Sequence, residues 1–164
     1  MRKLLLACLA LAALAAPVAG ADPGQWSVTG SGIVAGDHTE IAAHSAPGGT
    51  DARGRAHGQF TVVTTQFNEG GSIVCLNVSG NKALVVWRLD QPVTVPELPG
   101  RVFVYGAGYI EDNGSPVHGQ PVDRAVFYAV SEPNVGFFCT DPTGFFGAAL
   151  AAPLDSGNFV VQGG

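Results

Sequence analysis

One polar stretch between two apolar runs contains the residue types that bind a hard cation. The sequence EDNGSPVHGQPVDR, residues 111 to 124, holds carboxylate and amide oxygens, which are the ligands that Ca²⁺ prefers. Its spacing matches no calcium-loop motif, and Asn113-Gly114 also has the composition of a turn that Asp112 would cap. We therefore expect a turn here. A metal site is the weaker hypothesis, with Glu111, Asp112, Asn113 and Asp123 as its ligands.

The four histidines of the chain raise a second metal hypothesis. On one continuous strand His38 and His44 would face the same way, but about 20 Å apart, which is too far to share an ion. His57 and His118 could approach each other only through tertiary structure. We therefore interpret the histidines as solvent-facing residues and predict no cofactor.

The usual catalytic motifs are missing from the sequence. It has no Gly-x-Ser-x-Gly elbow, and GSGIVAG lacks the glycine spacing that cradles a phosphate. Glu111 and Asp112 are neighbours, so on a strand their carboxylates point to opposite faces and cannot work as an acid and base pair. These observations favour a protein that is not an enzyme.

Phenylalanines surround the last cysteine of the chain. We expect them to be core residues, because phenylalanine is mostly buried in folded proteins. Any that are exposed would mark an apolar pocket or a partner surface. The four residues are Phe137, Phe138, Phe145 and Phe146.

The first residues have the three parts of a secretory signal peptide. Arg2 and Lys3 are followed by an apolar run and then by Ala19-Gly20-Ala21, so we expect cleavage after Ala21, with Gly20 as the second choice. Cys8 lies in a sequence that superficially fits a lipidation box, but it comes too early and apolar sequence continues past it. Residues 1–21 are therefore predicted to be removed, and residues 22–164 to form a single β domain that is secreted or associated with the cell envelope.

The predicted mature chain is acidic. Removal of Arg2 and Lys3 takes the formal net charge from −5 to −7. A nucleic-acid partner would need a basic patch, so we expect none. We also expect no transmembrane segment after the leader, because no later apolar run is long enough. An apolar small molecule or an envelope component is the partner that the composition leaves open.

Two cysteines remain in the mature chain, Cys75 and Cys139. In an oxidising compartment such a pair is most simply a disulfide. Metal binding by these two residues lacks partners at a suitable spacing.

The apolar stretches are short, rich in Val, Phe and Tyr, and separated by Gly, Pro, Asn or Asp, which predicts an all-β fold: an antiparallel barrel, with a sandwich as the alternative. Residues 90–100 hold three prolines and are predicted to be a connection or an edge. Residues 142–153 could be a short strand, one helical turn or an apolar loop. The predicted strands are Gln25–Val34, Thr39–His44, Ala56–Gln66, Ser72–Val78, Lys82–Leu89, Arg101–Glu111, Asp123–Val130, Gly136–Thr140 and Asn158–Gln162.

Gly80-Asn81 predicts a two-residue hairpin turn and thereby a strand register. Opposed residues share a face, so the register groups one wholly apolar surface: Val74, Leu76, Val78, Ala83, Val85 and Trp87. The other face is mixed and carries Cys75, Asn77, Leu84, Val86 and Arg88. Cys75 must therefore meet Cys139 from outside the main core or from a second layer.

Several segments in order resemble a family of secreted bacterial proteins, found especially in actinobacteria. The matching segments are RAHGQF, SIVCLNVSGNKALVVW, EDNGSPVHGQPVDRAVFYAV, a later cysteine and LDSGNFVVQ, and they cover roughly residues 54–162. The family pattern is a Cys-Leu-x-Val-x-Gly-Asn-x-Ala hairpin, an Asp-Asn-Gly turn before Pro-x-Asp-Arg, and a closing Gly-Asn-Phe-x-Val strand. The resemblance implies an antiparallel β fold in which the last strand pairs with the first. It implies no activity. Trp87-Arg88 departs from the small, glycine-rich ending of the family hairpin.

These patterns predict a non-catalytic binding or structural module. One alternative is a small-molecule binder whose barrel cavity is lined by aromatic residues, as in lipocalins. The other is a cyclase or isomerase with a similar cavity and one buried ionisable group such as Glu40, His57 or Asp123. A cavity would separate both alternatives from a solid structural module, and a desolvated, unpaired carboxylate or histidine inside it would favour the enzyme.

Overall fold

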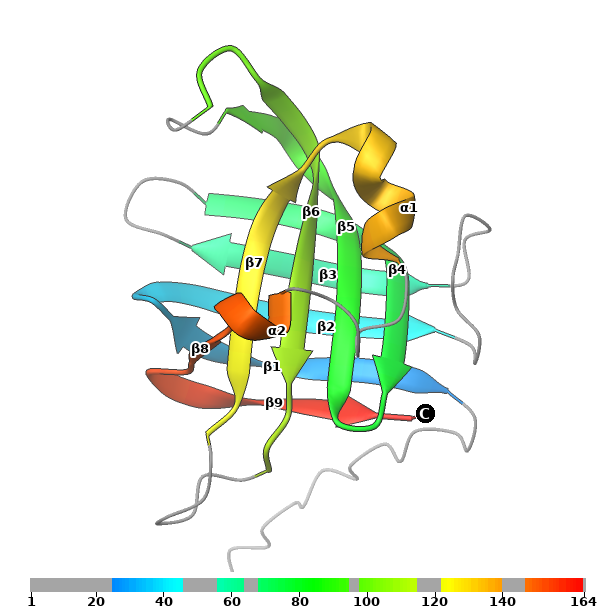
Figure 1. Ribbon diagram of the computed structural model, residues 1–164, viewed down its shortest axis with the longest axis vertical. Helices are drawn as coiled ribbons and strands as arrows, with labels where there is room; N and C mark the ends of the chain where they lie inside the picture. The colour runs from blue at the N-terminus through cyan, green and yellow to red at the C-terminus, as the bar shows by residue number, and fades with distance from the viewer. Residues whose placement is uncertain are drawn as a thin grey trace, which may run out of the picture.

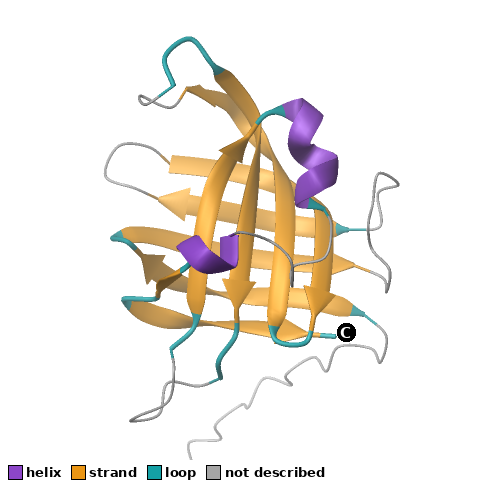
Figure 2. Ribbon diagram, in the orientation of Figure 1, coloured by secondary structure: helices purple, strands orange, loops and turns teal. Residues whose placement is uncertain are grey.

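The computed structural model describes residues 25–45, 56–63, 68–94, 98–114, 122–139 and 147–163. These residues form an antiparallel nine-stranded sheet that curls into a half-barrel (Figures 1 and 2). The all-β prediction is confirmed. The strands are β1 (Trp26–Val34), β2 (Asp37–Ser45), β3 (His57–Val63), β4 (Asn68–Ser79), β5 (Lys82–Thr94), β6 (Val102–Glu111), β7 (Arg124–Val130), β8 (Ala152–Pro153) and β9 (Ser156–Gln162).

The strand order is β8-β7-β6-β5-β4-β3-β2-β1-β9. The last strand therefore pairs with the first, with Gly30 opposite Phe159, as the family resemblance implies. Figure 1 shows β4 to β7 in front, with β1 to β3 and β9 running across them behind. The inner faces of these two layers enclose the main core. No helix in the described part of the chain is long and apolar enough to cross a bilayer.

The β4–β5 hairpin turns at Gly80-Asn81, as predicted. Gly80 has a positive φ of 60°, which suits the first central residue of a tight hairpin turn. The predicted pairs from Ser79 with Lys82 to Leu76 with Val85 are confirmed.

The predicted pairing of Val74 with Trp87 is wrong. A β-bulge lies between Ile73 and Cys75, so Ile73 takes the place opposite Trp87. The bulged Val74 is only partly buried and packs with the cluster on the outer face of the sheet. A bulge adds one residue to one strand, and it therefore exchanges the two faces of β4 for all the residues that precede it.

Strand β5 is longer than predicted and continues through Pro92 to Thr94. Its pairing with β4 ends at Leu89, whereas its pairing with β6 resumes at Val93 after an irregularity. Pro92 therefore lies where β5 has one neighbouring strand rather than two, which is where a strand tolerates a residue that cannot donate a backbone hydrogen bond.

The core is formed by alternate residues of the strands, which point inward. Trp87 fits because its neighbour on β6 is Gly106, where a Cβ atom would lie 2.3 Å from the indole ring. Small residues on β6 thus make the space that the large aromatic side chains fill. The fully buried side chains of this core include Val28, Ile41, Leu76, Val85, Ile110 and Phe159.

The outer face of β5 and β6 is covered by a second layer. Leu84, Val86 and Tyr109 are fully buried there, beneath the short helices α1 (Val135–Phe138) and α2 (Gly147–Leu150). Figure 2 shows both helices on this side of the sheet. The guanidinium of Arg124 donates to the carbonyl oxygen of Ala151 at 2.8 Å and so holds the end of α2 against β7.

The disulfide between Cys75 and Cys139 ties this layer to β4, with Cα atoms 5.9 Å apart. The pairing was predicted, and the second layer is one of the two arrangements that were expected for it. The strand predicted over Gly136–Thr140 is wrong, because a 3-10 turn (Glu132–Asn134) leads directly into α1. Proline in the first turn suits a helix start, since its fixed φ is already helical.

Two carboxylates close the half-barrel where no strand ladder does. Asp123 is buried and accepts hydrogen bonds from the backbone N–H groups of Asn113, at 2.8 Å, and Phe159, at 2.7 Å. Asp112 accepts from the N–H groups of Gly114, at 2.8 Å, and Val161, at 2.9 Å. The N–H groups on the free edge of β9 are therefore satisfied by side chains that follow β6 and precede β7.

We predict that Asp123→Asn lowers the free energy of unfolding by about 2–4 kcal/mol. The amide has nearly the same shape, but it replaces one of the two acceptor oxygens with a donor that faces a backbone N–H group. Urea denaturation would measure the loss. Asp90→Asn at an exposed position is the control and should change stability by less than about 0.5 kcal/mol. Equal effects of the two substitutions would contradict the assigned role of Asp123.

We also predict that Cys75→Ala combined with Cys139→Ala costs roughly 4 kcal/mol of stability. The disulfide spans a sequence separation of 64 residues, and its removal frees a large loop in the unfolded chain. Denaturation of the oxidised protein and of the double variant would compare the two. A difference below about 1 kcal/mol would contradict the prediction.

Candidate functional site

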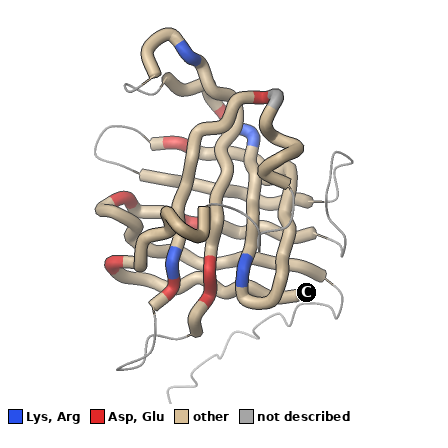
Figure 3. Tube along the Cα trace, viewed as in Figure 1, with Lys and Arg blue, Asp and Glu red and all other residues tan. Residues whose placement is uncertain are grey.

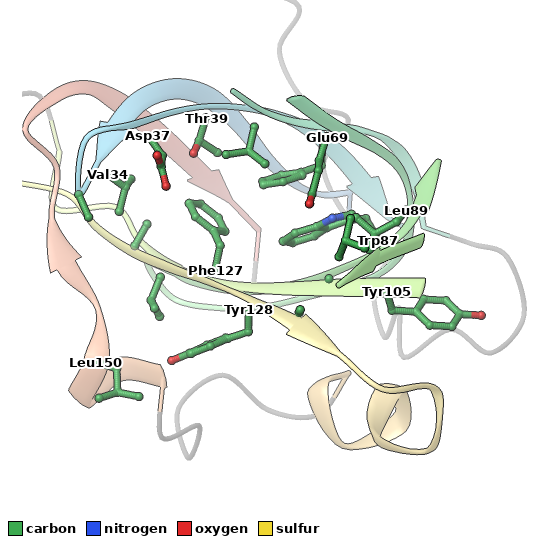
Figure 4. Close-up of a pocket in the computed structure, with 18 of the residues that line it drawn as sticks. Val34, Asp37, Thr39, Glu69, Trp87, Leu89, Tyr105, Phe127, Tyr128 and Leu150 are labelled. Atoms are coloured by element: carbon green, nitrogen blue, oxygen red, sulfur yellow. The ribbon is translucent and has the colours of Figure 1, made fainter. Parts of the chain in front are cut away.

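The half-barrel contains a cavity of about 400 Å³ on the inner face of its strands (Figure 4). Its inner wall comes from β1, β2, β3, β4, β5 and β7, so the curl of the sheet brings together residues that are far apart in the sequence. The side chains on this inner wall are Val34, Asp37, Thr39, Phe60, Val62, Glu69, Trp87, Leu89, Val93 and Phe127.

Three aromatic rings form one side of the cavity. Phe60 stacks on Trp87 with ring centroids 3.7 Å apart and planes inclined by 21°. Phe127 lies 5.3 Å from Phe60 and meets Trp87 edge-on at 6.1 Å. Gly108 leaves room for Phe127, because a Cβ atom at this position would lie 2.6 Å from its ring. The rings are thus held in fixed positions by strands and by the glycines beside them.

Three polar side chains also point into the cavity (Figure 4). Asp37 and Thr39 are alternate residues of β2, and Glu69 comes from β4. Thr39 is opposite Val62, which in turn is opposite Glu69, so these three residues form one cross-strand row on the inner face. Asp37 and Glu69 are only partly buried, which places them toward the opening of the cavity.

Glu69 lies in an environment that opposes its charge. Burial raises the pKa of its carboxyl above the ordinary value. The described residues that line the cavity include no Lys, Arg or His to offset this effect. Figure 3 shows how sparse positive residues are on the sheet. In the described part of the chain they are Lys82, Arg88, Arg101 and Arg124.

Two buried polar atoms at the cavity have no hydrogen-bond partner among the described residues. They are Oγ1 of Thr39, a residue that is 0% exposed, and Nε1 of Trp87, a residue that is 3% exposed. A buried donor without an acceptor costs about 1–3 kcal/mol, so such groups are rare in native proteins. Both atoms are therefore positions where a bound molecule would form hydrogen bonds.

The opening of the cavity runs along the edge of β7. The short strand β8 pairs with Arg124 and Ala125 of β7, and the residues of β7 that follow, Val126 to Ala129, form a rim of the cavity. Figure 4 shows Tyr105, Tyr128 and Leu150 on the far side of the sheet, pointing away from the cavity. These residues contribute to the outer margin rather than to the inner wall.

The predicted phenylalanine cluster lies elsewhere. Phe138 is partly buried and packs on the outer face of the sheet near Tyr128, whereas Phe137 is 55% exposed, against the expectation of a core residue. Its place in a four-residue helix over the sheet, instead of in a strand, explains this exposure. Phe145 and Phe146 lie outside the described residues.

The residues of the weaker metal hypothesis form structural contacts. Asp112 and Asp123 bind backbone N–H groups, and the side-chain amide of Asn113 donates to the carbonyl oxygen of Val122 at 2.9 Å. Glu111 lies 3.7 Å from the guanidinium of Arg124. Among the described residues, no three His, Cys, Asp or Glu side chains are grouped as a metal site would need.

None of the three described histidines lines the cavity. His44 and His57 face each other on β2 and β3, with ring centroids 5.6 Å apart, a pairing that the sequence did not indicate. His38 is exposed, and His118 lies outside the described residues.

None of the proposed buried acids or bases lies free in the cavity. Glu40 and His57 are exposed, and Asp123 is buried outside the cavity lining with both carboxylate oxygens bonded. Glu69 was not singled out in the sequence. In a regular strand, the inward position of Leu76 would place Glu69 on the outer face, because side chains alternate. The bulge at Val74 reverses this alternation and turns Glu69 inward. Gly70-Gly71 beside it is the one local signal of irregular strand geometry.

We predict that Glu69→Gln raises the melting temperature at pH 7 and raises it less near pH 4. The pKa of Glu69 is higher in the folded chain than in the unfolded chain, so ionised Glu69 favours unfolding. This stability difference is absent below the ordinary carboxyl pKa, where both states hold the proton, and develops as pH rises through the raised pKa.

Thermal denaturation of the variant and the wild type at both pH values would test this prediction. Glu40→Gln on the exposed face of β2 is the matched control and should show no such change with pH. A Glu69→Gln variant that loses more stability at pH 7 than at pH 4 would disprove the assigned environment.

No family model, no curated protein and no solved structure matches this chain.

Proposed function

We propose that this protein is a non-catalytic binding protein that takes up a small, mainly apolar molecule in the half-barrel cavity. The observation that carries the proposal is a cavity whose described lining includes three aromatic side chains, two carboxylates and two buried polar atoms without partners. Ligand sites are typically concave and apolar with a few convergent polar groups. A cavity of about 400 Å³ lies in the range that small-molecule sites occupy.

The proposal includes export of the protein. The disulfide between Cys75 and Cys139 supports an oxidising compartment. The apolar leader before Ala21 supports the same route. The family of secreted bacterial β-proteins that the sequence resembles is a further part of this proposal. A carrier or sensor of small molecules outside the cytoplasm fits these features together.

A cyclase or isomerase is the second candidate, because Glu69 is a partly desolvated carboxylate inside the cavity. A raised pKa suits a general acid or base. Proton abstraction beside a carbonyl group, however, creates negative charge on the substrate. Asp37 and Glu69 would both repel that charge, and among the described side chains of the lining the only buried N–H donor without a partner is the Trp87 indole. The geometry therefore favours binding over this chemistry.

We predict that Val62→Trp weakens the binding of a neutral apolar dye, N-phenyl-1-naphthylamine, at least tenfold. Val62 points into the cavity from β3, so the larger side chain occupies the proposed site. Fluorescence titration of the dye would measure the affinity. Val63→Trp is the matched control, because Val63 is the next residue on the strand and is 42% exposed on the opposite face.

The control keeps the same added side chain outside the cavity, so it should bind the dye like the wild type. Circular dichroism would establish that both variants are folded, and Val62→Phe is a smaller change that should weaken binding less. Equal affinity in the Val62 and Val63 variants would reject the cavity as the site.

A further inference from the structure

We propose that the cavity binds an organic cation, that is, a positively charged nitrogen group attached to an apolar body. The inference rests on the proposed function, because it assigns the charge and chemical class of the molecule that the cavity takes up. Four observations carry it: two inward carboxylates, no cationic residue in the described lining, an aromatic wall, and buried polar atoms without partners.

The formal charge of the cavity lining is negative. Asp37 and Glu69 enter from two different strands and both point into the space. Every other described lining residue is uncharged, so nothing in the described wall balances them. Two carboxylates at one opening attract positively charged molecules and repel anions such as fatty acids or phosphate esters.

The aromatic wall offers a second attraction for the same charge. The rings of Trp87, Phe60 and Phe127 lie within contact distance of one another. An ammonium group within about 6 Å of such a ring is attracted to its face, most strongly for tryptophan and more strongly where water is excluded. The combination of aromatic rings with a nearby carboxylate is the arrangement that proteins use to hold quaternary and protonated amines.

The environment of Glu69 fits a missing positive partner. Burial raises the pKa of its carboxyl because the charged form has lost water without gaining a compensating ion in the described structure. A cation in the cavity would supply that partner. It would also favour the ionised form of Glu69 again, as an opposite charge does at close range.

The unpartnered atoms are independent evidence for a ligand rather than for a solvated acidic cluster. Oγ1 of Thr39 is fully buried in the cross-strand row that contains Glu69, and it can accept a hydrogen bond from a protonated amine. Nε1 of Trp87 can only donate, so it would bind an acceptor atom on the body of the ligand. An acidic surface patch alone would leave neither atom buried without a partner.

The test compares three probes of similar shape by displacement of N-phenyl-1-naphthylamine at pH 7. They are benzyltrimethylammonium, its neutral carbon isostere neopentylbenzene, and the anion phenylacetate. We expect the cation to bind at least tenfold tighter than the neutral isostere and phenylacetate to bind most weakly. The preference for the cation should fall as the salt concentration rises.

Charge-removing variants identify the residues responsible. Glu69→Gln should lower the affinity for benzyltrimethylammonium about fivefold or more and leave the affinity for neopentylbenzene unchanged. Glu69→Gln combined with Asp37→Asn should abolish the preference for the cation over the neutral isostere. Glu40→Gln removes a carboxylate from the exposed face of β2 and should change neither affinity. Loss of binding to both probes in the charge variants would mean a structural role for the carboxylates and would overturn the inference.

The outcomes separate this inference from the proposed function. If neopentylbenzene binds as tightly as the cation, and Val62→Trp weakens both, the cavity is a binding site but its ligand is not a cation. If Val62→Trp weakens the binding of none of the probes, the cavity is not the binding site and the proposed function fails as well.

Discussion

The buried carboxylate of Asp123 is the interaction on which the shape of the molecule depends. A curled sheet that does not close by a continuous ladder leaves backbone N–H groups on its edge strand, and these groups must find acceptors. An ionised carboxylate only accepts, so one side chain can serve two N–H donors. Asp123 does so for Asn113 and Phe159, and it thereby fixes the β6–β7 end against β9.

The bulge at Val74 decides which residues face that cavity. Side chains alternate along a strand, so one additional residue exchanges inner and outer positions for everything that precedes it. Ile73 therefore lies opposite Trp87, and Glu69 points inward beside Val62. A regular β4 would direct Glu69 to solvent and leave the inner wall without this carboxylate. A local irregularity of one residue thus sets the chemistry of the site, whereas the hairpin turn sets the register beyond it.

Features fixed by local chemistry could be predicted from the sequence. Gly80-Asn81 determines the turn, the turn determines the pairing nearest to it, and the pairing places Cys75 outside the main core. The rest depends on tertiary structure. The segment at Gly136–Thr140 has strand-forming residues. Its described part, residues 136–139, nevertheless lies in or beside α1, over the sheet, and does not pair with a strand. Glu69 and the cavity depend on a bulge and on sheet curvature, for which Gly70-Gly71 was the only local sign.

The carboxylate of Asp123 and the polar groups at the cavity contrast in how they are satisfied. The buried carboxylate of Asp123 has both oxygens bonded at 2.7 and 2.8 Å. At the cavity, Thr39 Oγ1 and Trp87 Nε1 lack partners, and Glu69 is partly dehydrated without an opposite charge among the described residues. Apolar residues at positions 39 and 69 would remove the free-energy cost of burying these two polar side chains. The strand pairing would not change, since neither side chain takes part in the backbone ladder. Asn158 Oδ1 on β9 also lacks a partner among the described residues, but Asn158 does not line the cavity, so Thr39 Oγ1 and Trp87 Nε1 are the groups that the proposed ligand would satisfy.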